Sequence, residues 1–283
     1  RMWAMRIAHE GSLYEFGNGN VFVTLTYRDK DECDDEQLAS GYYIPSDWSL
    51  NVKHFQDFMK RLRKRYNDRR IRFFHCGEYG NRCLHGLDLE SVGCPLCSVG
   101  RPHYHACLFN ISFIDLEPYQ EINGELRYTS PELESIWKYG FVDVGELNFD
   151  SAAYVARYIM KKVTGPRADG HYQRVDLDGE ITFITPEYCT MSRRPGIGRD
   201  WYELYKGDLF PRDEVPVPGR GVFKGMPRYY EELFALENPL TLEEIKEVRQ
   251  KFLEEHADDY TPERLMDKYK VKCRQVEMLK RTV

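Results

Sequence analysis

The sequence predicts an α+β protein in which a central antiparallel sheet is flanked by helices, with a small α-helical region at the C-terminal end. Three observations predict it. Strand-like segments and a one-faced helical segment alternate in the first half of the chain, glycine and proline crowd together between residues 211 and 227, and helix-start signals follow. A chain of 283 residues can bury one sizeable core and a smaller appendage.

The strand-like segments are rich in β-branched and aromatic residues, which suit a pleated, half-buried surface. They occupy residues 21–27, 71–75, 104–109 and 141–144. Between the first two, one face of a predicted helix over residues 49–66 carries Val52, Phe55, Phe58, Met59 and Leu62. Short strands separated by helices and hairpin-like connections favour an antiparallel sheet.

The pattern changes beyond Gly196. The glycines and prolines of residues 211–227 indicate a connector. Residues 241–244 have the form of a capping box, and Thr261 followed by Pro262 predicts a second helix start. We therefore expect a main domain over residues 1–205, and a connector with an acidic helical region over residues 206–283.

The composition, with 42% hydrophobic and 14% aromatic residues, excludes a disordered chain. No apolar run approaches the roughly 20 residues of a membrane span, and the opening residues lack the apolar core of a secretory signal. We expect a cytosolic chain that starts upstream of Arg1, because this first residue is not methionine. The eight cysteines are then expected to be reduced thiols or metal ligands.

A net charge of −6 disfavours a phosphate-rich partner, but the charge is unevenly distributed. Residues 53–72 hold nine basic residues against two acidic ones, whereas acidic residues gather in 29–36 and 231–267. Two interpretations of the basic segment stay open: a phosphate-binding helix, or a solvated amphipathic helix without a ligand.

Two histidines, His103 and His105, alternate in a predicted strand and therefore project from one face, about 7 Å apart along the strand. Glu78, at the end of another predicted strand, supplies a third ligand. Two histidines and one carboxylate form a metal site with open positions for substrate. The alternative is that both histidines are ordinary residues of the sheet.

A second helix is predicted over residues 150–163, capped by Asp150 or Ser151. Tyr154, Tyr158 and Lys161 are expected on the face opposite its apolar residues, which favours chemistry over packing. A phenol with a pKa of about 10 is a weak nucleophile at neutral pH. A nearby cation, and a metal that polarises the phosphate under attack, would help it.

Two close pairs of metal-ligating side chains flank a short loop: Cys83 with His85, and Cys94 with Cys97. A tetrahedral structural zinc site needs such pairs, because a small loop without a core gains its order from the metal. Cys76 is an alternative to His85, although the predicted sheet restrains it. The other interpretation is a loop of reduced cysteines.

Several motifs together make the chain resemble the HUH-endonuclease rolling-circle replication initiators of gokushovirus-like microviruses, which are single-stranded DNA phages. The motifs are the strand at residues 22–27, Pro102-His103-Tyr104-His105, the two-tyrosine segment 154–162, Cys76-Gly77-Glu78-Tyr79-Gly80 and Arg193-Arg194-Pro195-Gly196. The resemblance covers roughly residues 20–205 and implies an HUH endonuclease fold, with residues 81–100 as a zinc-binding insertion.

The resemblance implies a metal-dependent nickase in which Glu78, His103 and His105 hold Mn²⁺ or Mg²⁺. Tyr154 and Tyr158 would be alternating nucleophiles, and Lys161 would steady the phosphate or the tyrosine oxygen. The residues expected to bind DNA are Lys60, Arg61, Arg63, Lys64, Arg65 and Arg157.

The implied function is nicking of a single-stranded DNA origin, which leaves a 5′-phosphotyrosine and a free 3′-OH that a host polymerase extends, followed by rejoining of the displaced strand. The chain lacks a phosphate-binding loop of the nucleotide hydrolases, so we expect a host helicase to separate the strands in the bacterial cytoplasm. Three alternatives stay open: an HUH relaxase or transposase, a hydrolytic metallophosphodiesterase, and a zinc-stabilised module that binds single-stranded DNA without catalysis.

Overall fold

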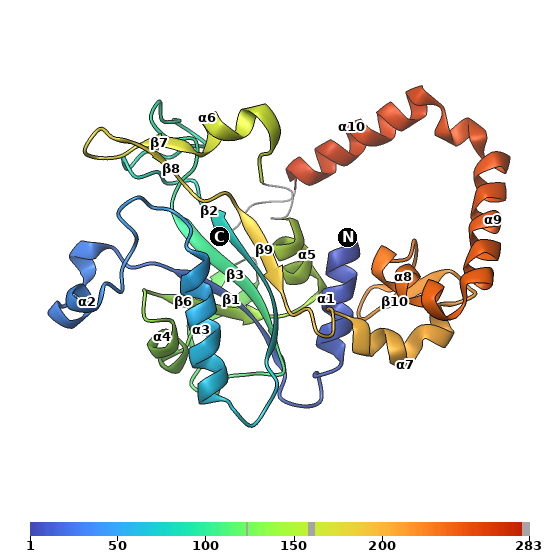
Figure 1. Ribbon diagram of the computed structural model, residues 1–283, viewed down its shortest axis with the longest axis horizontal. Coiled ribbons are helices and arrows are strands. Elements are labelled where there is room, and N and C mark those ends of the chain that lie inside the picture. The colour runs from blue at the N-terminus through green and yellow to red at the C-terminus, as the bar shows by residue number, and fades with distance from the viewer. Residues whose placement is uncertain (123, 158–161, 279–283) are drawn as a thin grey trace. The chain divides into compact units, whose positions relative to one another are not determined.

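The computed structural model describes residues 1–122, 124–157 and 162–278. Its main feature is a seven-stranded sheet with the strand order β4-β5-β6-β1-β3-β2-β9 (Figure 1). The strands are β1 (Asn20–Thr26), β2 (Arg72–Tyr79), β3 (Pro102–Phe109), β4 (Glu117–Ile122), β5 (Glu125–Thr129), β6 (Val142–Glu146) and β9 (Tyr188–Met191). Neighbouring strands run antiparallel and helices flank the sheet, which confirms the predicted α+β class.

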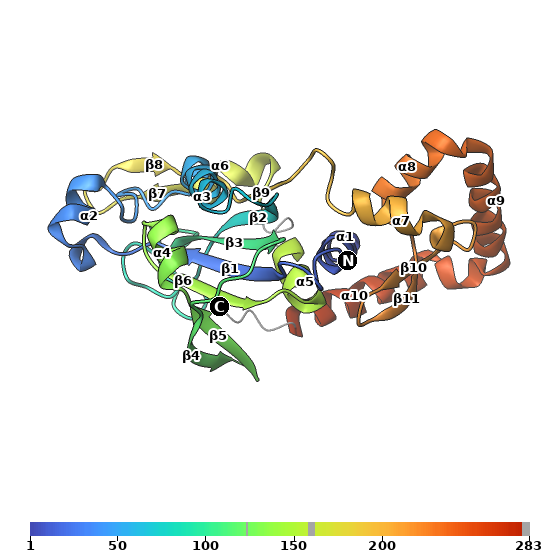
Figure 2. The same ribbon diagram turned by 90° about the horizontal axis from the view of Figure 1, so that it is seen from below.

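Four helices pack against this sheet or beside it: α1 (Met2–Ser12), α3 (Val52–Arg65), α4 (Pro131–Trp137) and α5 (Phe149–Arg157). Shorter elements lie in the connections: η1 (Lys30–Glu32), α2 (Asp35–Ser40), η3 (Gly165–Arg167), α6 (Ala168–Tyr172), β7 (Gln173–Val175) and β8 (Ile181–Phe183). β7 and β8 pair as a separate two-stranded sheet. The β4–β5 hairpin projects from the edge of the large sheet (Figure 2).

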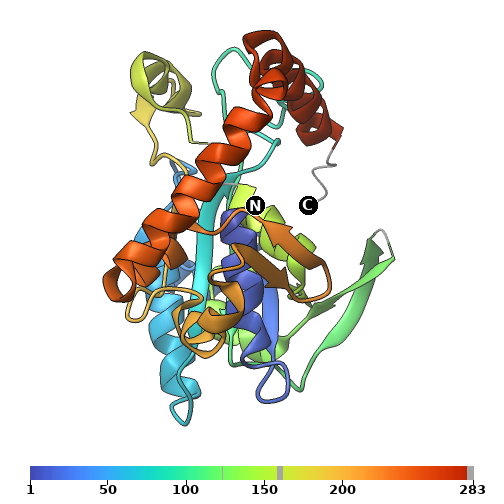
Figure 3. The ribbon, with the colours of Figure 1, turned by 90° about the vertical axis from the view of Figure 1, so that its right-hand side faces the viewer.

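The sheet separates two apolar clusters, because successive side chains of a strand point to opposite faces. On one face, Val23 and Leu25 of β1 join a cluster with Phe58 of α3 and Trp137 of α4. On the other face, residues of β1, β2 and β3 join a cluster with α1 and α5: Ala4, Ile7, Phe22, Phe74, Cys107, Ala152 and Val155. Figure 3 shows α3 on one side of β2, with α1 and α5 on the other.

The chain divides into two compact units, and the second one comprises residues 202–216 and 222–283. The remaining elements along the chain are α7 (Arg199–Leu209), β10 (Glu214–Val217), β11 (Gly221–Lys224), α8 (Arg228–Glu237), α9 (Pro239–Glu255), η4 (Ala257–Tyr260) and α10 (Pro262–Met278). Within the second unit, the rings of Phe210 and Phe234 stack with centroids 3.9 Å apart. Arg249 forms ion pairs with Asp213 and Glu231.

Several predicted boundaries need correction. The first helix of the acidic region begins at Pro239 and not at the expected capping box of residues 241–244, whereas α10 begins at Pro262 as predicted. The connector at residues 211–227 contains two short strands. The sequence analysis does not anticipate α1, which covers one face of the sheet. In the described part of the chain, no helix has the length and apolar character that a membrane span requires.

Candidate active site

Three neighbouring strands bring together the predicted metal ligands. Glu78 of β2 lies opposite His103 of β3, and His105 lies opposite Thr24 of β1. All of them project from the face that α1 and α5 cover, because they share the alternation of Phe22 and Phe74. One ligand atom from each of Glu78, His103 and His105 lies within 4.8 Å of the others. The spacing in the sequence and the antiparallel register together form this group, which we call the carboxylate-histidine group.

Hydrogen bonds orient the ligands. Oε1 of Glu78 lies 2.5 Å from Nε2 of His103 and 3.0 Å from Nε2 of His105. The opposite ring nitrogens are held from behind: Nδ1 of His105 lies 2.9 Å from Oγ1 of Thr24, and Nδ1 of His103 lies 3.2 Å from the carbonyl oxygen of Arg101. Both imidazoles therefore direct Nε2 at the same carboxylate oxygen.

The donor set suits a divalent cation. A carbonyl oxygen only accepts hydrogen bonds, so Nδ1 of His103 must carry a proton and donate it to Arg101. The neutral ring then presents a lone pair on Nε2 toward Glu78. Metal-ligating histidines are held in the same way, with the second ring nitrogen bonded to a carbonyl or hydroxyl. The residues present thus fit a two-histidine, one-carboxylate site.

The carboxylate-histidine group is almost fully buried: Glu78 and His105 are each 1% exposed. Burial opposes ionisation of Glu78, but the two histidines outweigh it and hold the pKa of Glu78 well below its usual range. The carboxylate is therefore charged, as a cation ligand must be.

Tyr154 of α5 packs directly beside this group. Its ring meets the ring of His105 edge-on, with centroids 5.3 Å apart, and meets Phe22 at 6.1 Å. The guanidinium of Arg157, one turn further along α5, lies 5.4 Å from the centre of the Tyr154 ring. The expected segregation of Tyr154 from the apolar face is wrong, because its half-buried ring packs on the same cluster as Ala152 and Val155.

The start of α5 also differs from the prediction. The side chain of Asn148 accepts hydrogen bonds from the backbone nitrogens of Asp150 and Ser151, so Asn148 caps the helix in their place. Tyr158 and Lys161 lie outside the described residues.

The four predicted zinc ligands also come together. Cys83, His85, Cys94 and Cys97 offer ligand atoms that all lie within 4.8 Å of one another. Nδ1 of His85 lies 3.1 Å from Sγ of Cys97 and 3.7 Å from Sγ of Cys94. Burial raises the pKa of Cys97 to about 12. We call these residues the cysteine group.

The alternative ligand Cys76 is not part of the cysteine group. It belongs to the apolar cluster under α1 and α5, and its partner across the β2–β9 ladder is Cys189. The sheet therefore keeps Cys76 in the core.

The loop that carries the cysteine group ends beside the carboxylate-histidine group. It joins β2 to β3, and its ends meet where the backbone nitrogen of Gly80 donates to the carbonyl oxygen of Arg101 over 2.9 Å. That same oxygen accepts from His103. A Cβ atom on Gly100 would lie 2.2 Å from the carbonyl oxygen of Gly80, so this close approach needs glycine. The base of the loop thus positions one metal ligand.

The basic helix lies away from the carboxylate-histidine group. α3 packs on the opposite face of the sheet through Phe55, Phe58 and Leu62. Its cations also have partners within the protein: Arg61 donates to the carbonyl oxygens of Ile136 and Trp137, Arg63 to that of Ile71, Arg65 pairs with Glu132 and Lys60 with Asp57. Lys64 is exposed. The structure therefore does not bring these predicted DNA contacts together with the metal ligands.

Three residues of the site escaped the sequence analysis. Thr24 supports His105, and the alternation of β1 together with the pairing of His105 would have indicated it. Arg127 of β5 pairs with Asp143 of β6, and its guanidinium lies 5.4 Å from the centre of the Phe22 ring, beside Tyr154. No local pattern signals this pair, because it depends on how β5, β6 and β1 align.

A family model described as replication-associated protein ORF2 matches residues 20–86 and 93–163. The match includes both ligand groups and the described part of α5, and it is interrupted inside the cysteine loop. The chain belongs to this family of replication-associated proteins. The recognised resemblance to phage replication proteins is thus confirmed.

Three relatives carry related names. The chain is 30% identical over 237 residues to replication-associated protein VP4 of Bdellovibrio phage phiMH2K, across 83% of this chain and 63% of the relative. It is 31% identical over 242 residues to replication-associated protein ORF2 of Spiroplasma virus 4, across 82% and 63%. It is 31% identical over 194 residues to replication-associated protein ORF4 of Chlamydia phage 1, across 65% and 41%.

The chain thus spans less than two thirds of the length of each of these relatives. No solved structure matches it.

Proposed function

We propose that the chain initiates rolling-circle replication by nicking single-stranded origin DNA with a tyrosine, and that residues 1–205 form the nickase domain. One observation carries the proposal: the ring of Tyr154 packs against His105 within a group of two histidines and one carboxylate that suits a divalent cation. Family membership supports a role in replication, and the tyrosine beside a cation site supports the nicking chemistry.

In the proposed reaction, the phenolic oxygen of a tyrosine attacks the scissile phosphorus in line. A phosphotyrosine bond forms at the 5′ end, the bond to the 3′ oxygen breaks, and that oxygen leaves as a 3′-OH after taking a proton. A Mn²⁺ or Mg²⁺ ion held by Glu78, His103 and His105 would act as a Lewis acid on the phosphate. Arg157 would favour the tyrosinate form of Tyr154 through its charge.

The second tyrosine, Tyr158, would cut the regenerated origin after one round of synthesis. The 3′-OH released in that step would then attack the first phosphotyrosine, so that the displaced strand is rejoined and the first tyrosine is restored. Phosphoryl transfer between tyrosines preserves the energy of the broken phosphodiester bond, and no nucleotide hydrolysis is needed for joining. Host polymerase and helicase in the bacterial cytoplasm would supply synthesis and strand separation.

The proposal is tested by capturing the covalent product. The full chain is incubated with Mn²⁺ and labelled single-stranded fragments of the genome that encodes it, and the products are separated on a denaturing gel. We expect label to migrate with the protein and to be released by protease. A cut product free of protein would indicate a hydrolytic phosphodiesterase. Binding without any cut would indicate a non-catalytic module, and either outcome contradicts the proposal.

We further propose that the cysteine group holds structural zinc. Three thiols and one imidazole that converge on one point form a closed tetrahedral ligand set, and thiolates prefer Zn²⁺ to hard cations. The site is therefore chemically distinct from the carboxylate-histidine group, which has oxygen and nitrogen ligands only.

Replacing Cys94 and Cys97 together by serine is expected to remove about one zinc per chain, measured by elemental analysis after dialysis. Nicking should fall by less than about tenfold, because the cysteine loop positions His103 only through Arg101 and touches no ligand itself. Cys33→Ser with Cys273→Ser is the matched control, since both thiols lie outside the cysteine group, and it should keep the zinc. Wild-type protein without zinc, purified without chelator, would refute the site.

A further inference from the structure

An arginine-rich pocket lies at the end of β2 remote from the carboxylate-histidine group. Its volume is about 490 Å³, and it is lined by Arg63, Asn67, Arg69, Arg70, Ile71, Arg72, Phe73, Ser192, Arg193 and Arg194. Arg72 and Glu78 are six residues apart on β2, which corresponds to roughly 20 Å at about 3.3 Å per residue. The pocket is therefore separate from the proposed cutting site.

The charge of the pocket is not balanced by its own lining. None of the residues that line it is acidic, and only two of its arginines pair with carboxylates outside the lining: Arg69 with Asp68, and Arg72 with Glu10. Four cations remain without such compensation: Arg63, Arg70, Arg193 and Arg194. Burial and the nearby charge of Arg70 lower the pKa of Arg63, which shows that these like charges lie close together.

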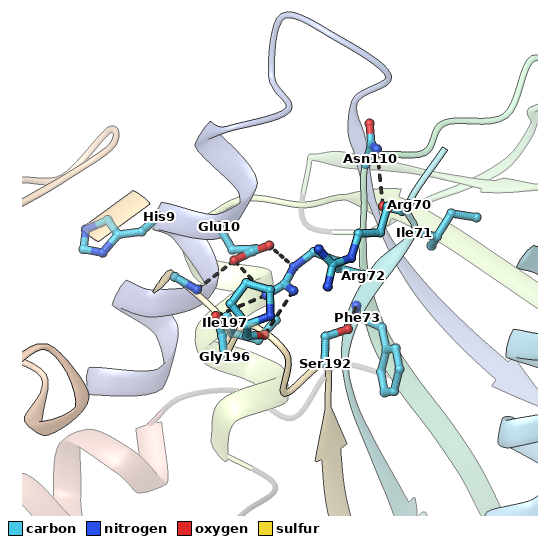
Figure 4. A network of polar contacts seen from close by, with 12 residues as sticks. His9, Glu10, Arg70, Ile71, Arg72, Phe73, Asn110, Ser192, Gly196 and Ile197 are labelled. Atoms are coloured by element: carbon cyan, nitrogen blue, oxygen red, sulfur yellow. Dashed lines mark hydrogen bonds and ion pairs between the residues drawn. The ribbon is translucent and has the colours of Figure 1, made fainter. Parts of the chain in front are cut away.

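A buried ion pair holds the pocket open from below. Arg72 and Glu10 are 2% and 0% exposed in their side chains, and their pairing links β2 to α1 (Figure 4). Arg72 also donates to the carbonyl oxygens of Pro195 and Gly196, over 3.0 and 3.1 Å. The loop that carries Arg193 and Arg194 is thus anchored to the core rather than left to solvent.

Two further contacts complete the pocket. The guanidinium of Arg70 donates to the carbonyl oxygen of Arg194, so it lies beside the anchored loop. The hydroxyl oxygen of Ser192 accepts from the backbone nitrogen of Phe73, which leaves its hydrogen available to an anion. The aromatic ring of Phe73 lies under Arg63, 5.5 Å from its guanidinium carbon.

We propose that this pocket binds backbone phosphates of the DNA strand at a distance from the scissile phosphate. Guanidinium groups pair with phosphate oxygens through two parallel hydrogen bonds, and several arginines around one aromatic ring form a typical single-strand binding surface. The volume exceeds that of a single phosphate, and four cations suit a chain of phosphates. This inference rests on the proposed function for the identity of the strand.

The pocket would explain how an acidic chain holds DNA. It concentrates positive charge at one place, roughly 20 Å from the metal ligands, and a strand that contacts both sites would be held at two points. Contact at the pocket would fix where along the strand the scissile phosphate falls. The pocket would thereby contribute to positioning without touching the reacting atoms.

The test measures the salt dependence of binding to a fluorescent 30-nucleotide oligothymidylate, without added Mn²⁺. Replacing Arg193 and Arg194 together by glutamine should flatten the slope of log affinity against log salt by about 1.4, at about 0.7 per phosphate contact for single strands. The same loss should weaken binding about tenfold at 0.15 M salt. Arg193→Lys with Arg194→Lys should keep the slope, because the charge is retained.

Lys246→Gln with Lys251→Gln is the control for overall charge, since both are exposed cations of α9, and it should leave the slope unchanged. An unchanged slope in the glutamine variant would overturn the proposal, and so would an equal loss in the lysine variant. Inorganic phosphate is titrated at constant ionic strength as a second arm. Micromolar binding of phosphate with no change in the DNA slope would assign the pocket to a free anion.

The binding assay needs no cleavage, so the two proposals fail separately. A flattened slope in the variant, with wild-type protein that forms no covalent product, would retain the pocket and refute the nickase. A covalent product together with an unchanged slope would do the reverse.

Discussion

Replacing His103 or His105 by alanine is expected to lower the rate of DNA cleavage by at least about a thousandfold, since Lewis-acid stabilisation contributes several kcal/mol to the transition state. Affinity for single-stranded DNA should stay within about threefold, because the proposed phosphate contacts lie at the other end of β2. The measurements are single-turnover cleavage with Mn²⁺ and anisotropy with labelled DNA. The two readouts separate loss of chemistry from loss of binding.

Folding is the main confounding factor, because both histidines are buried and bonded to Glu78. Thermal unfolding with and without Mn²⁺ resolves it. The wild-type protein should melt at a higher temperature when Mn²⁺ is present, and either variant should melt cooperatively without this increase. A variant that still gains stability from Mn²⁺ would contradict the ligand assignment. Affinity that fell together with activity would make the histidines binding or folding residues instead.

The structure changes the explanation of DNA affinity. A run of basic residues in a helix predicts the binding surface, but a helix that packs on a sheet must use part of its charge for local contacts. Arg61 caps the carbonyl end of α4, and Arg65 pairs with Glu132 at the start of α4. Of the helix residues predicted to bind DNA, Arg63 also lines the arginine-rich pocket, which draws its other charges from residues distant in the sequence.

The parts of the site that follow a local rule could be predicted from the sequence. His103 and His105 share a face because strand residues alternate, and four ligands within a short loop converge because the loop is short. The apolar pattern locates β1 and β3 within one or two residues, since apolar side chains mark strands that are buried on both faces. These signals need no knowledge of strand order.

The remaining parts depend on contacts between distant segments. Arg127 reaches Phe22 because β5 pairs with β6 and β6 with β1, and no spacing in the sequence encodes that order. The helical pattern predicts a polar face for Tyr154, yet its ring is covered by Phe22 and His105 of the sheet. Helical periodicity describes one helix alone, whereas burial depends on the surface that the helix meets.

The packing of Tyr154 makes the tyrosine test unusually clean. Tyr154→Phe removes only the hydroxyl group, so the ring contacts with Phe22 and His105 are kept and stability should change little. We expect Tyr154→Phe and Tyr158→Phe each to permit a first cut, because the remaining tyrosine can attack, but to impair rejoining and re-initiation. The double variant should form no covalent adduct, with cleavage reduced by at least about ten-thousandfold.

The measurement combines a denaturing gel for the adduct with peptide mass spectrometry for the modified tyrosine. Tyr43→Phe, in the segment between α2 and α3, is the matched control and should form adduct at the wild-type rate. The double variant should still gain thermal stability from Mn²⁺, because Glu78, His103 and His105 are untouched. Adduct that persists in the double variant would place the nucleophile on another residue. Cleavage without adduct in that variant would show that water attacks the phosphate, and the strand-joining step of the proposed cycle would then have no intermediate from which to proceed.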